Sequence, residues 1–158
     1  MIKTISLILT LVLCLSLTAC GAATLTTTKV EQALADCDGK LDMQTSGDKV
    51  TGFTYTVEGV NAKDLVDKKY SRKAVDAVMA GDPDKITFGQ WKAAKAIAPL
   101  MSIDVLLGGD KGNFNSNAFI EKLLGVICDG KTVEYDGWAV SAKADQDSDS
   151  ITISVVSK

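Results

Sequence analysis

The alternation of hydrophobic and polar residues predicts that the globular part of the chain begins with a short amphipathic helix. This helix begins near Thr28, where Thr27 or Thr28 is the expected N-cap and Glu31 stands at the reciprocal capping position. Apolar residues then recur at helical spacing as far as Cys37, and Asp38-Gly39 ends the helix.

A pair of strands is expected next, over residues 40–44 and 49–57, with a polar, glycine-containing turn between them. In the second strand apolar and polar residues alternate, which is typical of a strand with one buried face. The apolar positions of this strand are Phe53, Tyr55 and Val57. Gly52 marks the expected site of a β-bulge.

The middle of the chain has the apolar spacing of helices. Asn61 is the expected N-cap of the first, and Ser71 either caps or kinks its continuation, which ends at Gly81-Asp82-Pro83. Thr87 and Gln90 form a candidate capping box, so a further helix is expected to begin there.

A strongly apolar run follows this capping box. Pro99 is expected to interrupt the helix, and residues 100–107 beyond it are apolar except for Ser102 and Asp104. Because the run is too short to cross a bilayer and contains a carboxylate, it is interpreted as a buried core helix that ends at Gly108-Gly109.

The C-terminal third predicts one more helix and then strands. The helix begins after Ser116 and ends at Cys128, and Asp136-Gly137 is a strong hairpin signal. The strands are expected over residues 132–135, 138–144 and 151–157. The whole pattern predicts an α+β fold: an N-terminal helix, a strand pair, central helices and a C-terminal antiparallel three-strand meander.

The N-terminal segment has the pattern of a secretory signal peptide. Lys3 precedes an uncharged, leucine-rich stretch over residues 4–18, which is shorter than a membrane-spanning helix requires. The boundary Leu17-Thr18-Ala19-Cys20 resembles the lipobox of bacterial prolipoproteins. This resemblance, confined to residues 1–21, implies that Cys20 is acylated on its sulfur, for example with palmitate, and becomes the first residue of the mature protein.

The expected organisation follows from this boundary. Residues 1–19 form the signal peptide, residues 20–27 a lipid-anchored tether, and residues 28–158 a single globular domain. The alternative is an ordinary secreted protein that is cut after an alanine near the same position and keeps Cys20 as a thiol.

The cysteine count predicts a disulfide. Cys14 leaves with the signal peptide and Cys20 takes the lipid, so Cys37 and Cys128 remain in a compartment that is oxidising. A disulfide between these two cysteines is therefore expected. Two buried thiols or a metal pair are the alternatives, and a zinc site would have only carboxylates to complete it because the chain contains no histidine.

Charge and composition narrow the function. Without Lys3, 16 basic side chains stand against 20 acidic ones. This mild acidity argues against nucleic acid or anionic lipid as an electrostatic partner. The absence of histidine removes the usual general base and the commonest metal ligand, so we expect no cofactor and no enzymatic activity. A small hydrolase that uses paired carboxylates is the alternative.

Three other patterns are weak. Asp145, Asp147 and Asp149 alternate as in a calcium loop, but the turn glycine and the final glutamate are missing, so a hairpin turn with at most a weak cation site is expected. Residues 108–112 are glycine-rich without a phosphate-binding ending and are interpreted as a connection. Trp91 and Trp138 are expected in the core.

The expected function is that of a non-catalytic binding or interaction lipoprotein of the cell envelope, with a membrane-proximal envelope protein as its partner. A structural lipoprotein is a further alternative. Because Gly21 follows the lipid cysteine where an inner-membrane retention signal has aspartate, the resemblance implies the periplasmic side of the outer membrane in a two-membrane cell. In a cell with one membrane, the outer face of the cytoplasmic membrane is expected.

Overall fold

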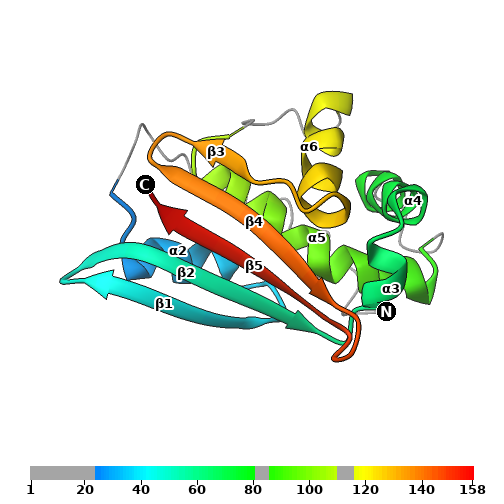
Figure 1. Ribbon diagram of the computed structural model, residues 1–158, viewed down its shortest axis with the longest axis horizontal. Coiled ribbons are helices and arrows are strands. Elements are labelled where there is room, and N and C mark those ends of the chain that lie inside the picture. The colour runs from blue at the N-terminus through cyan, green and yellow to red at the C-terminus, as the bar shows by residue number, and fades with distance from the viewer. Residues whose placement is uncertain (1–23, 81–85, 110–115) are drawn as a thin grey trace.

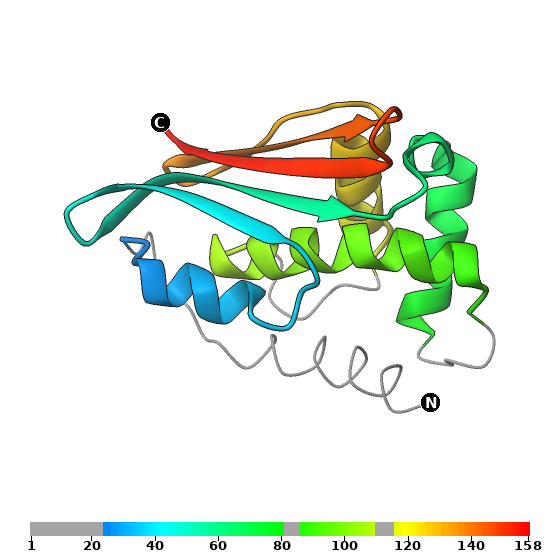
Figure 2. The ribbon, with the colours of Figure 1, turned by 90° about the horizontal axis from the view of Figure 1, so that it is seen from below.

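The computed structural model of the chain describes residues 24–80, 86–109 and 116–158. It has two layers, an antiparallel sheet and a layer of helices that covers one face of the sheet (Figures 1 and 2). The predicted α+β class is confirmed. Among the described residues, no helix has both the length and the apolar character needed to cross a membrane. The predicted signal peptide, Cys14, Cys20 and the helix stop at residues 81–83 lie outside the described residues.

The sheet has five strands, and the two predicted strand groups form one sheet. The strands are β1 (Lys40–Ser46), β2 (Lys49–Glu58), β3 (Val133–Tyr135), β4 (Trp138–Asp145) and β5 (Ser150–Ser157). Their order is β1-β2-β5-β4-β3, and every neighbouring pair is antiparallel. The strand β5 therefore lies in the centre of the sheet and joins the strand pair β1-β2 to β4 and β3.

A bulge lies near the predicted position in β2. Gln44 pairs with Gly52 and Thr45 with Val50, so Thr51 is the extra residue. The Thr51 hydroxyl donates to the carbonyl oxygen of Gln44 at 3.2 Å, which ties the bulge to β1.

The helix layer contains five helices among the described residues. They are α2 (Thr27–Leu34), α3 (Ala62–Leu65), α4 (Lys68–Met79), α5 (Phe88–Leu106) and α6 (Asn117–Cys128). The capping box of Thr87 with Gln90 and the caps at Asn61 and Ser116 are present as predicted.

The N-terminal boundary differs from the prediction. The N-cap of α2 is Thr26, whose hydroxyl accepts a hydrogen bond from the Lys29 amide. The preceding Leu25 is only 3% exposed, and its carbonyl accepts a hydrogen bond from the Val50 amide at 2.9 Å. The cap therefore lies one residue before the predicted Thr27 or Thr28, and Leu25 before it is already packed in the core.

Ser71 does not cap a helix. It lies inside α4, and its hydroxyl donates to the carbonyl oxygen of Leu65 at 2.5 Å across the break between α3 and α4. The side chain of Asp67 instead accepts a hydrogen bond from the Tyr70 amide at the start of α4.

The predicted interruption at Pro99 is wrong, because α5 continues through this residue to Leu106. Pro99 cannot donate the hydrogen bond that the Lys95 carbonyl would accept. The helix is buried on all sides from residue 96 to residue 105, and this packing outweighs the lost bond. The predicted buried core helix over residues 100–107 is confirmed as the second half of α5.

Candidate functional site

One face of the sheet is uncovered by any described element, because all described helices lie on the other side (Figure 2). The covered face carries Phe53, Tyr55 and Val57 of β2 and the isoleucines and Val155 of β5, all buried. Since alternate residues of a strand point to opposite faces, the intervening polar residues make up the open face.

Short hydroxyl side chains fill the middle of this open face. We call them the hydroxyl array: Thr54, Thr56, Ser141, Thr152 and Ser154. Cross-strand register places Thr54, Ser154 and Ser141 in one row, and Thr56 and Thr152 in the next. The hydroxyls of Thr56 and Thr152 lie 3.1 Å apart and share a hydrogen bond.

Charged and apolar side chains border the hydroxyl array. Lys143 lies at one end of the row that contains Thr56 and Thr152. Asp42 lies beside Thr54 at one end of the other row. Further along β5, Val156 is 55% exposed between Gly52 and Ala139. The open face therefore has short side chains at its centre and the exposed apolar side chain of Val156 at one end.

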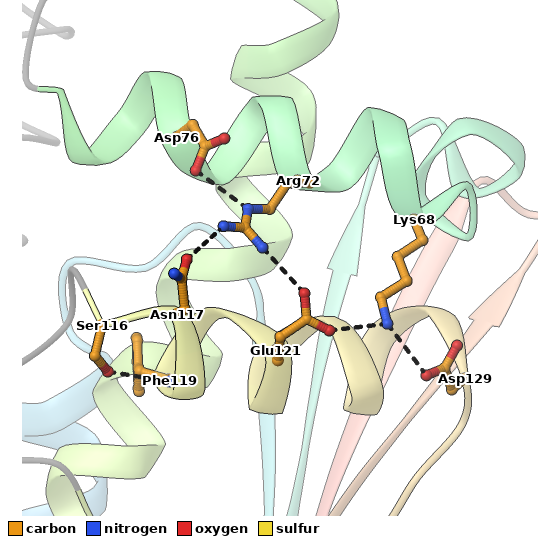
Figure 3. Close-up of polar contacts among 8 residues, drawn as sticks. All are labelled: Lys68, Arg72, Asp76, Ser116, Asn117, Phe119, Glu121 and Asp129. Atoms are coloured by element: carbon orange, nitrogen blue, oxygen red, sulfur yellow. Dashed lines mark hydrogen bonds and ion pairs between the residues drawn. The ribbon is translucent and has the colours of Figure 1, made fainter.

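A second polar cluster joins the outer surfaces of α4 and α6 (Figure 3). The Arg72 guanidinium is its centre: Nη1 lies 3.0 Å from Glu121 Oε1, and Nη2 donates to Asn117 Oδ1 at 2.7 Å. Lys68 Nζ lies 3.0 Å from Glu121 Oε2 and 3.8 Å from Asp129 Oδ2.

The charges of this surface cluster suit a contact between two helices and do not suit acid catalysis. The hydrogen bond from Lys68 lowers the pKa of Glu121, and the charges of Lys68 and Arg72 act in the same direction. A general acid at neutral pH needs the opposite shift. Because these side chains are also widely exposed to solvent, we assign them to orienting α6 on α4.

A buried charged cluster lies under β3. Asp104 on α5 is 1% exposed, and its Oδ1 lies 2.6 Å from Lys122 Nζ. The Tyr135 hydroxyl donates to the same oxygen at 2.5 Å. The ammonium of Lys122 also lies 5.4 and 5.5 Å from the ring centres of Phe119 and Tyr135. A buried carboxylate paired in this way ties α5, α6 and β3 together.

The predicted disulfide between Cys37 and Cys128 is absent, and both residues are thiols. The sulfur of Cys37 lies 4.0 Å from the Ser102 hydroxyl at the C-terminal half of α5, whereas Cys128 Sγ donates to the Leu65 carbonyl at 3.5 Å. Each sulfur therefore has its own partner on a different element. The number of cysteines in the sequence carries no information about where Cys37 and Cys128 lie in the fold.

The aspartates between β4 and β5 form the predicted hairpin turn. Asp145 Oδ1 accepts a hydrogen bond from the Asp147 amide at 3.0 Å, and Asp149 has a positive φ of 46°. A hydrogen bond from Ser148 is the main cause that lowers the pKa of Asp145. Within residues 24–80, 86–109 and 116–158, no three histidine, cysteine or carboxylate side chains are placed to hold a metal ion.

The tryptophans confirm the sequence interpretation in part. Trp138 is partly buried and packs against the core. Trp91 is only partly buried, and it follows the exposed Phe88 by one turn of α5.

Comparison of the chain with protein-family models, with curated proteins and with solved structures finds no match.

Proposed function

We propose that this chain is a lipid-anchored protein of the cell envelope that binds a partner through the open face of its sheet and catalyses no reaction. The lipobox-like residues 17–20 support the anchor, and Cys20 is the proposed acylation site. The partner that we propose is another envelope protein at the membrane to which the lipid is attached.

The observation that carries the binding role is the hydroxyl array. Its side chains are short, so little rotamer freedom is lost when a partner covers them. Threonine and serine hydroxyls both donate and accept hydrogen bonds, and Val156 adds exposed apolar surface at one end. A flat protein surface can therefore approach the strands closely.

The experiment compares two changes at the centre of the array. Ser154→Arg places a long charged side chain between Thr54 and Ser141, whereas Ser154→Ala removes only the hydroxyl. After crosslinking in cells and solubilisation of the envelope, we expect the wild type and Ser154→Ala to recover the same partner. We expect Ser154→Arg to lose it while its thermal unfolding stays close to that of Ser154→Ala.

Equal recovery with Ser154→Arg would refute binding through this face. Lys73→Glu on the exposed surface of α4 is the control for a general effect of surface charge, and it should recover the partner normally. Turnover of an envelope substrate that is lost on replacing one carboxylate would refute the non-catalytic role.

A further inference from the structure

The outer surface of α5 carries two aromatic side chains with lysines beside them; Phe88 is exposed and Trp91 is half-buried. Phe88, Trp91, Lys92 and Lys95 are spaced by three and four residues, which places them on one face of the helix. We call these four residues the α5 stripe. Phe88 is 76% exposed, and Lys92 Nζ lies 5.1 Å from the centre of its ring.

The stripe faces away from the core. Ala93, Ile97 and Leu100 are buried, and helical spacing puts them on the opposite side of α5. In Figure 2 the helix layer lies on one side of the sheet, so the stripe and the hydroxyl array belong to different layers of the molecule.

The chemistry of the stripe matches the boundary between lipid headgroups and acyl chains. Tryptophan concentrates at that level of a bilayer, and phenylalanine is common on the apolar face of helices that lie there. Lysine stems lie along apolar surface while their ammonium groups remain in water. The net acidity of the chain argues against a purely electrostatic attachment. Insertion of Phe88 and Trp91 does not need anionic lipid.

The short length of chain before the domain keeps the start of α2 close to the bilayer, and α2 lies in the same helix layer as α5 (Figure 2). This step rests on the proposed acylation of Cys20. The five steps from Cys20 to Leu25 span at most about 18 Å when fully extended. Leu25 is packed at the start of α2, and the loop after α2 is held to the stripe itself by the ion pair between Asp38 and Lys95 at 2.5 Å.

We infer that the α5 stripe rests in the headgroup layer of the bilayer that holds the acyl chains of Cys20. The helix layer then faces the membrane, and the open face of the sheet is presented away from it. The occupant of the stripe is thus a lipid surface, and the anchor supplies the high local concentration that makes so small a contact effective.

The two tryptophans make a direct test possible. In the acylated protein, Trp138→Phe leaves Trp91 on the stripe as the only tryptophan, and Trp91→Phe leaves Trp138 on the sheet. Each variant is reconstituted into phosphatidylcholine vesicles with or without bromine on the acyl chains. We expect bromine to quench Trp91 several-fold more strongly than Trp138, and Trp91 emission to shift to shorter wavelength.

Phe88→Ser in the variant that retains Trp91 should weaken this quenching while the protein still floats with the vesicles. Flotation without preferential quenching of Trp91 would overturn the inference and leave the anchor standing. A mature protein whose mass shows no acyl chains would overturn both. Quenching of Trp91 and Trp138 to the same extent would show that the stripe has no special contact with lipid.

Discussion

The carboxylate of Asp104 and the ammonium of Lys122 form an ion pair in which the carboxylate is almost completely buried, at 1% exposure. We expect Lys122→Met to destabilise the fold by about 3–5 kcal/mol, because it leaves a buried charge without its partner while keeping an apolar stem. Urea denaturation measures the loss. Lys143→Met, on the exposed edge of the hydroxyl array, is the control and should change the free energy of unfolding little.

A loss below about 1 kcal/mol for Lys122→Met would mean that the other contacts of Asp104 are sufficient to hold its charge. The double variant Asp104→Asn with Lys122→Met tests this directly. It should recover part of the stability, because the buried charge is then gone.

The same chemical change should have opposite effects at two tyrosines. The Tyr55 hydroxyl is buried and has no partner of regular hydrogen-bond geometry among the described residues, whereas the Tyr135 hydroxyl donates to Asp104. We expect Tyr55→Phe to raise the free energy of unfolding by about 1 kcal/mol and Tyr135→Phe to lower it by about 1–3 kcal/mol. Thermal or urea unfolding of the two variants checks the signs. A stabilised Tyr135→Phe variant would contradict the assigned hydrogen bond.

Tyr55 also predicts a loss of stability at alkaline pH. Burial, with the nearby charges of Cys37 and Asp38, raises the pKa of Tyr55 above its ordinary value. The unfolded chain therefore releases this proton first, and stability falls as the pH rises above about 10. Urea midpoints between neutral and alkaline pH measure the slope. Tyr55→Phe should make the decline shallower, and an unchanged slope would exclude Tyr55 as its cause.

The reactivity of the cysteines distinguishes the two free thiols of the structure from the disulfide that the number of cysteines predicted. In urea without reductant, both Cys37 and Cys128 should react with iodoacetamide. At mildly alkaline pH, Cys128 should react several-fold more slowly in the folded protein than in urea. Burial raises the pKa of its thiol in the folded protein, and only the thiolate attacks iodoacetamide. Peptide mass spectrometry over time follows each site. Failure of both sites to react in urea until reductant is added would instead support a disulfide.

The lipid anchor predicts a change of compartment. Cys20→Ser should prevent acylation, so the protein should leave the membrane fraction and no mature form carrying acyl chains should be found. Cell fractionation with intact-mass measurement checks both points. Cys14→Ser, inside the apolar run, is the matched control and should leave the acylated form unchanged. A membrane-bound, acylated Cys20→Ser protein would refute the assignment.

Local patterns predicted most elements of this fold. Phe53, Tyr55 and Val57 alternate with polar neighbours, and they are buried on the covered face of β2. The capping box at Thr87 was equally visible, because its hydrogen bonds join residues three apart. Pro99 misled the prediction because its penalty is local, whereas the burial that outweighs it comes from other elements.

The candidate site needed information that no local pattern contains. Within each strand, the sequence shows hydroxyl residues alternating with apolar ones. Thr54 and Thr56 do so in β2, and Thr152 and Ser154 in β5. Their combination into one array depends on the pairing of β2 with β5, which joins segments far apart in the chain. The signal for the buried cluster was present as Asp104 inside an apolar run, but its partners Lys122 and Tyr135 had no pattern that linked them to it.

The central position of β5 has a consequence for the order of folding. The two halves of the sheet, β1-β2 and β4-β3, pair with each other only through β5, so the sheet cannot be completed until β5 has been synthesised and has left the ribosome. Pairing between distant segments is also intrinsically slow. For a chain that is exported as proposed, this topology delays completion of the sheet until β5 has emerged from the ribosome. During this delay the polypeptide is still extended and fits a narrow translocation channel. The native structure then forms on the far side of the membrane.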